Sequence, residues 1–245
     1  MGGQARIIRE ARRWNVLDCG RRFGKTDLGE ILISEPLLNG LPVGWFAPTY
    51  KVLDDAWEEI KRIYAPVIKQ RSDTDKKMTL ITGGVLEAWT LDREGAGRSR
   101  KYARAIIDEA ARVDGLMDKF NFDIRPTLID YSGSAYFLST PKGLNDFHKI
   151  WQLAADDPEW ARWQMPTHEN PYIDPAELEA MRQAMPDRVF RQEILAEFLE
   201  DGSFFQNVNG CCVIEAPDKP EQHAGHRLAA GLDWAMSEDF TVLTV

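Results

Sequence analysis

Short apolar runs alternate with longer amphipathic stretches through the first 150 residues of the chain. The apolar runs predict buried strands near residues 16–17, 44–48, 103–108 and 135–139. The amphipathic stretches predict helices at residues 28–38 and 53–68, and residues 78–91 are typical of a hairpin that turns at Gly83-Gly84. A repeated order of strand and helix is typical of a parallel sheet covered by helices. The sequence therefore predicts an α/β fold with a mainly parallel central sheet flanked by helices.

The pattern differs after residue 143. A helix is predicted up to residue 155, then a short strand at 160–165 and two helices at 175–185 and 187–197, which Pro186 separates. Residues 201–225 are rich in Gly, Asn, Pro and acidic side chains, as in a linker, and strand, turn and strand follow. The sequence thus divides into a core at 1–150, a small helical subdomain at 151–200, a linker at 201–226 and the start of another domain at 227–245.

Residues 19–26 read Cys-Gly-Arg-Arg-Phe-Gly-Lys-Thr and lie between a predicted strand and a predicted helix. That order is typical of a phosphate-binding loop, in which backbone N–H groups and the positive end of the helix surround the anion. Lys25 would reach the β- and γ-phosphates of a nucleotide, and Thr26 would hold Mg²⁺ through its hydroxyl. The usual pattern G-x-x-x-x-G-K-[ST] begins with glycine, where this chain has Cys19, and Gly20 comes one residue later. The alternative is a Gly-Lys-Thr that lies between strand and helix by coincidence.

A second segment, Ala-Arg-Ala-Ile-Ile-Asp-Glu-Ala-Ala at residues 103–111, is an apolar run that ends in two adjacent carboxylates. Such a run predicts a buried strand. At the carboxyl end of a parallel strand, Asp108 can bind the hydration shell of Mg²⁺ while Glu109 polarises an attacking water, as phosphoryl transfer requires. The alternative is a strand end with two solvated acids.

A third segment, residues 135–143, is an apolar strand that ends in the hydroxyls of Ser139 and Thr140 and a Pro-Lys-Gly turn. Hydroxyls at this position can sense a γ-phosphate, although Ser-Thr-Pro also occurs in ordinary turns. Together the three segments place a phosphate loop, an acid pair and a sensor at strand ends of one sheet, where ligands of open α/β sheets bind.

With these three segments the chain resembles the large terminase subunit of tailed bacteriophages, the motor that packages double-stranded DNA into a procapsid. Residues 19–26, 106–111 and 139–143 are similar to that family's Walker A, Walker B and coupling motifs. The resemblance covers essentially the whole chain. It implies a P-loop NTPase fold, and it makes residues 151–200 similar to the family's lid subdomain, which closes on the nucleotide.

The resemblance also implies roles for individual residues. Those implied to bind Mg·ATP are Gln4, Gly20, Arg22, Gly24, Lys25 and Thr26, with Asp108 as a second partner of Mg²⁺. Glu109 falls at the catalytic base, and Arg21 at an arginine that acts within the same subunit. Ser139 and Thr140 fall at the coupling motif. For Gln4, which resembles the family's adenine-contacting glutamine, the alternative is a solvated side chain near the N-terminus.

Residues 93–104 are rich in glycine and dense in positive charge. In the family, an arginine just before the Walker B strand reaches the neighbouring subunit's site, where it stabilises charge in the transition state. Arg98 is our candidate for this role, and Arg100 is the second. The alternative is a flexible basic loop that contacts only DNA phosphate or solvent.

The segment at 228–245 resembles the opening hairpin of the RNase H-like nuclease that follows the motor in this family. Asp233 falls at the first metal-binding carboxylate of that nuclease. Two-metal cleavage requires several carboxylates, and the sequence stops before the others. We therefore expect an interrupted nuclease domain and no cleavage by this chain.

Composition restricts the function further. The chain has 245 residues and a net charge of −9, which argues against a protein that coats nucleic acid through bulk charge. Basic side chains nevertheless cluster in the first 26 residues and at 93–104, so transient contact with DNA remains open. Three cysteines form no disulfide framework, and no apolar run is long enough for a membrane span or a signal peptide. We expect a protein of the bacterial host cytoplasm without membrane contact.

The predicted function is ATP hydrolysis that drives translocation of viral double-stranded DNA into a procapsid. The resemblance implies the portal protein, the small terminase subunit and a homo-oligomeric ring as partners. Three alternatives stay open. They are another P-loop nucleic-acid translocase or helicase, a nucleotide-dependent assembly module without turnover, and a metabolic kinase.

Overall fold

The computed structural model describes residues 3–200, 231–233 and 242–244, and the chain divides into two compact units, Met1–Asp201 and Gly202–Val245. The α-helices of the first unit are α1 (Gly3–Glu10), α2 (Lys25–Leu38), α3 (Tyr50–Tyr64), α4 (Leu116–Asp118), α5 (Asp146–Leu153), α6 (Pro175–Ala184) and α7 (Asp187–Glu193). Its strands are β1 (Trp14–Cys19), β2 (Pro42–Ala47), β3 (Ile68–Ser72), β4 (Lys77–Leu80), β5 (Val85–Thr90), β6 (Arg104–Asp108), β7 (Ser134–Ser139) and β8 (Trp160–Met165). Among the described residues, no helix is both long and apolar enough to span a bilayer.

One eight-stranded sheet organises the first unit, with strand order β3-β4-β5-β2-β6-β7-β1-β8. All neighbours from β5 to β8 in this order are parallel, and β4 pairs antiparallel with both β3 and β5. The predicted hairpin at 78–91 is therefore confirmed as β4 and β5. Because β1, β6 and β7 are parallel, Cys19, Asp108 and Ser139 all end their strands at the same edge of the sheet. The predicted α/β class with a mainly parallel sheet is confirmed.

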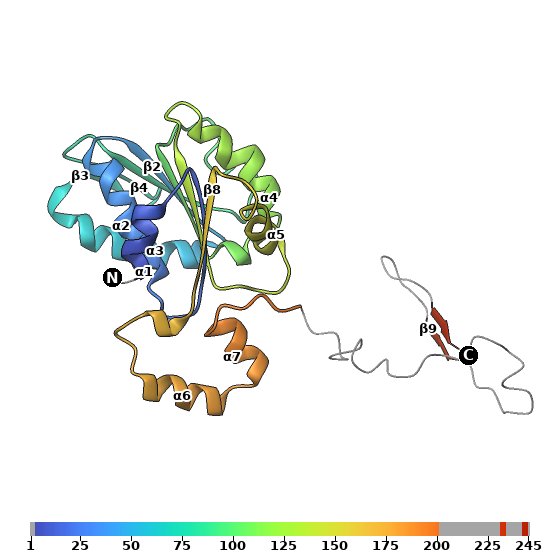
Figure 1. Ribbon diagram of the computed structural model, residues 1–245. Coiled ribbons are helices and arrows are strands. Elements are labelled where there is room, and N and C mark those ends of the chain that lie inside the picture. Colours follow the sequence, from blue (N-terminus) through green and yellow to red (C-terminus); the bar gives the residue numbers. More distant parts are fainter. Residues whose placement is uncertain (1–2, 201–230, 234–241, 245) are drawn as a thin grey trace, which may run out of the picture. The chain divides into compact units, whose positions relative to one another are not determined.

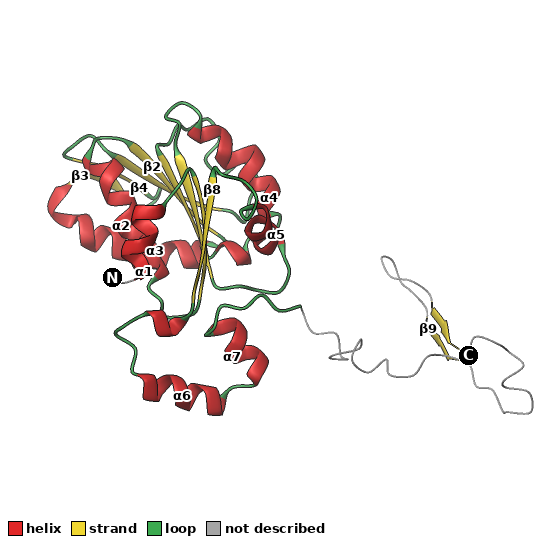
Figure 2. Cartoon of the chain, in the orientation of Figure 1, coloured by secondary structure: helices red, strands yellow, loops and turns green. Residues whose placement is uncertain are grey.

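Helices cover both faces of this sheet (Figures 1 and 2). Successive strand residues point to opposite faces, so Ile106 packs in the core beneath α2 and α3, whereas Ile107 packs on the other face with the segment 116–128 and α5. Both faces are thus buried, which is why these strands read as continuous apolar runs. Four aromatic side chains of β2 and α3 are buried in the core: Trp45, Phe46, Trp57 and Tyr64.

The predicted helix at 53–68 has different bounds. α3 ends at Tyr64, a 3₁₀ turn spans Ala65–Val67, and β3 begins at Ile68. Pro66 has no N–H group and cannot continue the α-helical hydrogen bonds. The predicted helix therefore included the 3₁₀ turn and Ile68, the first residue of the edge strand β3.

The boundary of the helical subdomain also differs from the prediction of 151–200. The predicted strand at 160–165 is present as β8, but it pairs in parallel with β1 at the edge of the main sheet. The sheet therefore includes residues up to Met165, and the small helical part begins after it. α6 and α7 lie beyond one end of the sheet (Figure 1).

In the second unit the structure describes β9 (Gly231–Asp233) and β10 (Val242–Thr244), which pair antiparallel. This pairing agrees with the predicted strand, turn and strand at 228–245. Asp233 ends β9, and its assignment as a nuclease ligand stays a prediction. The linker predicted at 201–226 lies outside the described residues.

Candidate active site

The loop between β1 and α2 is shaped to hold an anion. Gly24 has φ 89° and ψ 44°, in the left-handed region, and it precedes the first residue of α2, Lys25. A side chain with a Cβ is disfavoured in this conformation, which explains the glycine. No side chain caps the N-terminus of α2, so its first N–H groups lack the usual side-chain acceptor. An oxyanion such as phosphate satisfies this kind of helix end.

Lys25 connects this loop to a second strand end. Its side chain is largely buried, and Nζ donates a hydrogen bond of 2.9 Å to Oγ1 of Thr140, which directly follows β7. The predicted phosphate-binding lysine and the predicted coupling hydroxyl are therefore in direct contact, although 115 residues separate them.

The predicted acid pair lies at the end of β6. Asp108 is buried, and its Oδ1 accepts a hydrogen bond from the backbone N–H of Glu109 at 3.0 Å. Burial, and after it the neighbouring Glu109 carboxylate, raise the pKa of Asp108 to about 7, although Lys25 and that N–H group partly oppose the shift. Glu109 has φ 48°, a left-handed conformation that is uncommon outside glycine and often marks functional sites. Its Oε2 lies 3.5 Å from Nε of Arg112.

Ser139 connects the acid pair to the end of β7. Its buried Oγ accepts a hydrogen bond from the N–H of Ala111 at 3.0 Å and donates to the carbonyl of Thr140 at 2.9 Å. The turn that carries Glu109 and the turn that carries Thr140 are thus joined through one hydroxyl.

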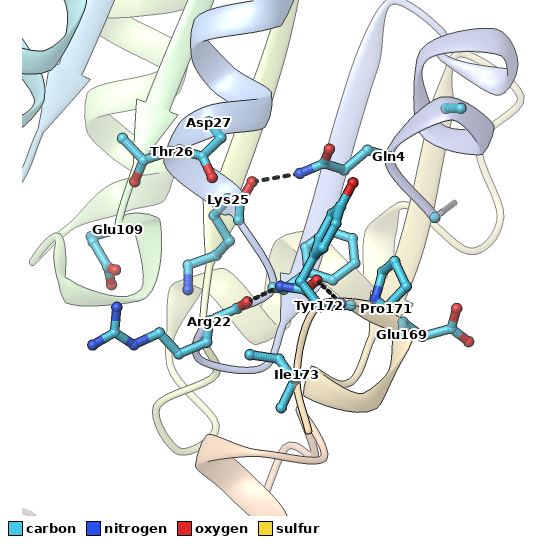
Figure 3. Close-up of a pocket in the computed structure, with 15 residues that line it drawn as sticks. Gln4, Arg22, Lys25, Thr26, Asp27, Glu109, Glu169, Pro171, Tyr172 and Ile173 are labelled. Carbon is cyan, nitrogen blue, oxygen red and sulfur yellow. Dashed lines mark hydrogen bonds between the residues drawn. The ribbon is translucent and has the colours of Figure 1, made fainter. Parts of the chain in front are cut away.

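Two cavities meet at the phosphate loop. The first, of about 760 Å³, is lined by residues of the N-terminal helix, the phosphate loop and the segment after β8, and it includes Gln4, Arg22, Gly24, Lys25, Thr26 and Glu109 (Figure 3). The second, of about 1040 Å³, includes Arg21, Arg22, Lys25, Glu109 and Thr140. These volumes are within or close to the range of small-molecule sites. The structure thus brings most of the predicted nucleotide-binding and catalytic side chains to two adjoining cavities.

Gln4 is placed by α1, a helix that the sequence pattern did not reveal. Its Nε2 donates a hydrogen bond to the carbonyl of Gly24 at 3.0 Å (Figure 3). Gln4 is therefore hydrogen-bonded to the phosphate loop, and its contact with adenine stays a prediction.

The departure from the usual loop pattern has a structural explanation. Cys19 is fully buried in the core on the α2 side of the sheet, as the last residue of β1. A Cβ at Gly20 would lie 2.4 Å from the carbonyl oxygen of Ile194 and 2.5 Å from Oγ1 of Thr167. Real Cβ atoms do not approach backbone this closely, so the glycine is required one residue later than usual because the helical subdomain contacts the loop there.

Two residues that the motifs did not identify connect the helical subdomain to the phosphate loop by hydrogen bonds. Thr167 donates from Oγ1 to the carbonyl of Arg21 at 2.8 Å, and Asn170 donates from Nδ2 to the carbonyl of Arg22 at 2.7 Å. Arg22 itself has φ 62°. No local pattern marks Thr167 or Asn170 in the sequence. Their role arises because β8 pairs with β1, which places the residues after β8 beside the phosphate loop.

The two predicted catalytic arginines differ in position. Arg21 lines the second cavity, and its Nε lies 3.4 Å from Oε2 of Glu193 in α7. Arg98 is not among the residues that line either cavity. Its Nε instead pairs at 2.6 Å with Oδ1 of Asp123, a buried carboxylate that also accepts the N–H of Gly95.

Asp18, the residue before Cys19, is an unexpected member of this region. It is fully buried in β1, and neither carboxylate oxygen has a hydrogen-bond partner within the part of the chain that the structure describes. Burial raises the pKa of Asp18 to about 8, and the positive charge of Lys25 partly opposes the shift.

The site fits Mg²⁺ as a partner of phosphate. Within residues 3–200 and the two short described strands of the second unit, no three His, Cys, Asp or Glu side chains form a metal cluster. Mg²⁺ in phosphoryl-transfer sites is usually held by one or two protein oxygens together with substrate phosphates. The buried carboxylate of Asp108 and the hydroxyl of Thr26, which faces the first cavity, are donors of this kind.

A phosphate loop after β1, an acid pair after β6 and a hydroxyl after β7 define a P-loop NTPase fold. Comparison with known proteins shows which members of this class the chain is similar to. The chain is 30% identical over 199 residues to the terminase large subunit of Escherichia phage T5, an alignment that includes 77% of this chain and 45% of that protein. The chain is therefore related to the large terminase subunits of phages, and it spans about 45% of this relative's length.

Solved structures agree on the fold. The large terminase ATPase domain of Thermus phage P74-26 superposes with a TM-score of 0.68 at 22% identity, over 80% of this chain and 92% of that one. The large terminase of another thermophilic bacteriophage, in complex with ADP, superposes with a TM-score of 0.67 at 13% identity, over 81% of this chain and 54% of that one. No protein-family model matches the sequence.

Proposed function

We propose that the chain binds Mg·ATP at residues 20–26 and hydrolyses it as the motor domain of a terminase. One observation carries the proposal. Lys25 and Glu109 line the same two cavities, and Lys25 donates a hydrogen bond to Thr140, which lines the second cavity. A phosphate-binding cation, a carboxylate able to act as base and a hydroxyl sensor are the groups that phosphoryl transfer requires.

Each side chain has a distinct chemical task in this proposal. Lys25 and the N-terminus of α2 hold the β- and γ-phosphates. Glu109 accepts the proton of the attacking water, because its carboxylate lines the cavity and its ion pair with Arg112 is partly exposed to solvent. Arg21 balances negative charge that develops on the γ-phosphate. Mg²⁺, held by Thr26 and Asp108, would neutralise charge on the phosphate oxygens.

Two findings support adenine nucleotide as the substrate. The large terminase of the thermophilic bacteriophage compared above shares this fold, and its structures carry ADP or ATP-gamma-S. Gln4 lies beside the phosphate loop at the first cavity, where the resemblance places a contact to adenine.

The work of the motor is inferred from the relationship to terminase large subunits. We propose that hydrolysis moves double-stranded DNA into a procapsid, with the portal protein and the small terminase subunit as partners and a homo-oligomeric ring as the active assembly. Arg98 would act on the site of a neighbouring subunit, and residues 166–200 would be the lid. Asp233 would be the first ligand of a nuclease. A relative from an Escherichia phage supports the cytoplasm of a bacterial host as the place of action.

Phosphate release from Mg·ATP tests the proposal. We expect Glu109→Ala to retain ATP but to lower turnover about 10²- to 10⁴-fold, the range for loss of a general base. Glu94→Ala, which removes an exposed acid outside both cavities, is the matched control and should hydrolyse like the parent. Equal turnover by Glu109→Ala and the parent would overturn the assignment. ATP-dependent oligomerisation without phosphate release would instead favour the assembly module.

A further inference from the structure

Tyr172 is an aromatic residue that the structure leaves 94% exposed. It lines the first cavity together with Gln4 and Gly24, and Figure 3 shows it on the Gln4 side of the phosphate loop. Large aromatic side chains are usually at least partly covered. A tyrosine that is open to solvent beside a ligand cavity therefore offers an unoccupied ring face.

The backbone around Tyr172 is held firmly despite this exposure. Asn170 to Ile173 form a turn, in which the N–H of Ile173 donates to the carbonyl of Asn170 at 3.2 Å. Pro171 occupies the second position of this turn, where its fixed φ is favourable. The Oδ1 of Asn170 accepts the N–H of Tyr172 at 3.0 Å, an arrangement by which Asn side chains stabilise turns.

Asn170 also attaches this turn to the phosphate loop. While its Oδ1 holds the N–H of Tyr172, its Nδ2 donates to the carbonyl of Arg22 at 2.7 Å. One side chain thus connects the backbone of the phosphate loop to the backbone of the exposed tyrosine. The position of the ring is coupled to the loop that would hold the phosphates.

We propose that Tyr172 provides the stacking surface for the purine base of the bound nucleotide, and that Asn170 is the positioning residue that sets the distance between base and phosphates. The inference rests on the proposed function, because it assigns the base end of the same site. Every base has a π-face that an aromatic ring can stack on. Gln4, at the same cavity, is left to contact the polar edge of the base.

Calorimetric titration of the full chain with two ligands tests the assignment. ATP carries a base, whereas inorganic tripolyphosphate has only the phosphates. We expect Tyr172→Ala to weaken ATP about tenfold, within the usual range for loss of one stacked base, and to leave tripolyphosphate unchanged. Tyr172→Phe keeps the ring and should bind ATP within about twofold of the parent. Asn170→Ala should weaken ATP more than tripolyphosphate.

Unchanged ATP binding by Tyr172→Ala would overturn the inference, and so would equal weakening of both ligands, because the tyrosine would then act through the loop. Failure of the proposed function would give a different result. In that case the parent and Lys25→Ala would bind ATP equally, or neither would bind it.

Nitration of tyrosines by tetranitromethane gives a second readout that needs no variant. Tyr172 should be nitrated in the free protein and protected by ATP, but not by tripolyphosphate. Tyr50 and Tyr131, which are 56% and 45% exposed and lie outside both cavities, are internal controls that should react in all samples. Equal nitration of Tyr172 with and without saturating ATP would overturn the proposal.

Discussion

The phosphate loop and the basic segment at 93–104 both carry dense positive charge. They differ in whether their cations are paired with acidic side chains of the same chain. In the basic segment, four cations pair with acids of the same chain at 2.6–3.4 Å: Arg98 with Asp123, Arg100 with Glu87, Lys101 with Asp130 and Arg104 with Glu35. In the phosphate loop, Arg21 also pairs with an acid, Glu193, at 3.4 Å. Lys25 differs, because its one side-chain hydrogen bond among the described residues goes to the neutral hydroxyl of Thr140.

Buried acids show the same contrast. Asp123, beneath the basic segment, accepts both the Arg98 guanidinium and the N–H of Gly95. Asp18, in the strand that leads into the phosphate loop, has no partner for either oxygen in the part of the chain described. A count of charges in the sequence does not separate these cases. The comparison indicates that the basic segment is stabilised by internal pairing, whereas the phosphate loop keeps its lysine available for a ligand.

The largest difference is expected in nucleotide affinity. Lys25→Ala and Arg98→Ala each remove one cation. Lys25→Ala should weaken ATP binding by about 100-fold or more, because a charge-assisted contact to phosphate is lost. Arg98→Ala should bind ATP like the parent in the isolated chain, because Arg98 lies outside both cavities. Isothermal titration measures both, and a comparable loss in the two variants would contradict the comparison.

The second prediction concerns how the free energy of unfolding depends on pH, which should differ between variants of the two buried acids, Asp18 and Asp123. The folded state holds the proton of Asp18 up to about pH 8, whereas an ordinary Asp loses it near pH 3.8. The free energy of unfolding therefore falls as pH rises from about 3.8 to about 8, and Asp18 no longer changes it above pH 8. Asp18→Asn removes this dependence and should be more stable than the parent at about pH 9, on the order of a few kcal/mol. At about pH 4, near the ordinary pKa of Asp, the two proteins should be alike.

Asp123→Asn is the matched control for this experiment. It should lower stability at the same alkaline pH, because the Arg98 guanidinium loses its charged partner. Thermal unfolding at several pH values gives both results. Parallel stability curves for the parent and Asp18→Asn would show that Asp18 does not titrate as described.

A smaller loss is expected where the helical subdomain contacts the phosphate loop. Gly20→Ala would place a Cβ 2.4 Å from the Ile194 carbonyl and should cost about 2 kcal/mol, a usual value for forced crowding. Cys19→Ala changes the neighbouring position without adding a polar group to the core and leaves this contact intact. Limited proteolysis should detect faster cleavage at residues 166–200 in Gly20→Ala only. Unchanged proteolysis would argue against a close contact at Gly20.

The smallest effect concerns the ion pairs of the basic segment. Arg98→Ala should cost about 1–2 kcal/mol of stability, because it leaves the Asp123 carboxylate buried with one backbone donor. Lys101→Ala breaks a pair between two exposed side chains and should cost below about 1 kcal/mol. Urea unfolding distinguishes them, and equal losses would show that burial of Asp123 has no consequence.

Sequence alone determined the features that depend on contiguous residues. The phosphate loop, the acid pair and the hydroxyl pair each require particular backbone and side chains within a few positions, and their strands read clearly because both faces of the sheet are buried. The order of these segments was enough to predict a common edge of one parallel sheet, since parallel strands share the direction of their carboxyl ends.

Only the tertiary structure decided which distant residues complete the site. β8 joins the main sheet beside β1, and this return of the chain brings Thr167, Asn170 and Tyr172 to the phosphate loop. The pairing of Arg98 with Asp123 likewise joins a turn residue to a residue of a short helical segment, 25 positions apart. Such contacts depend on strand order and loop paths, which arise from packing of the whole core and leave no periodic signal in the sequence.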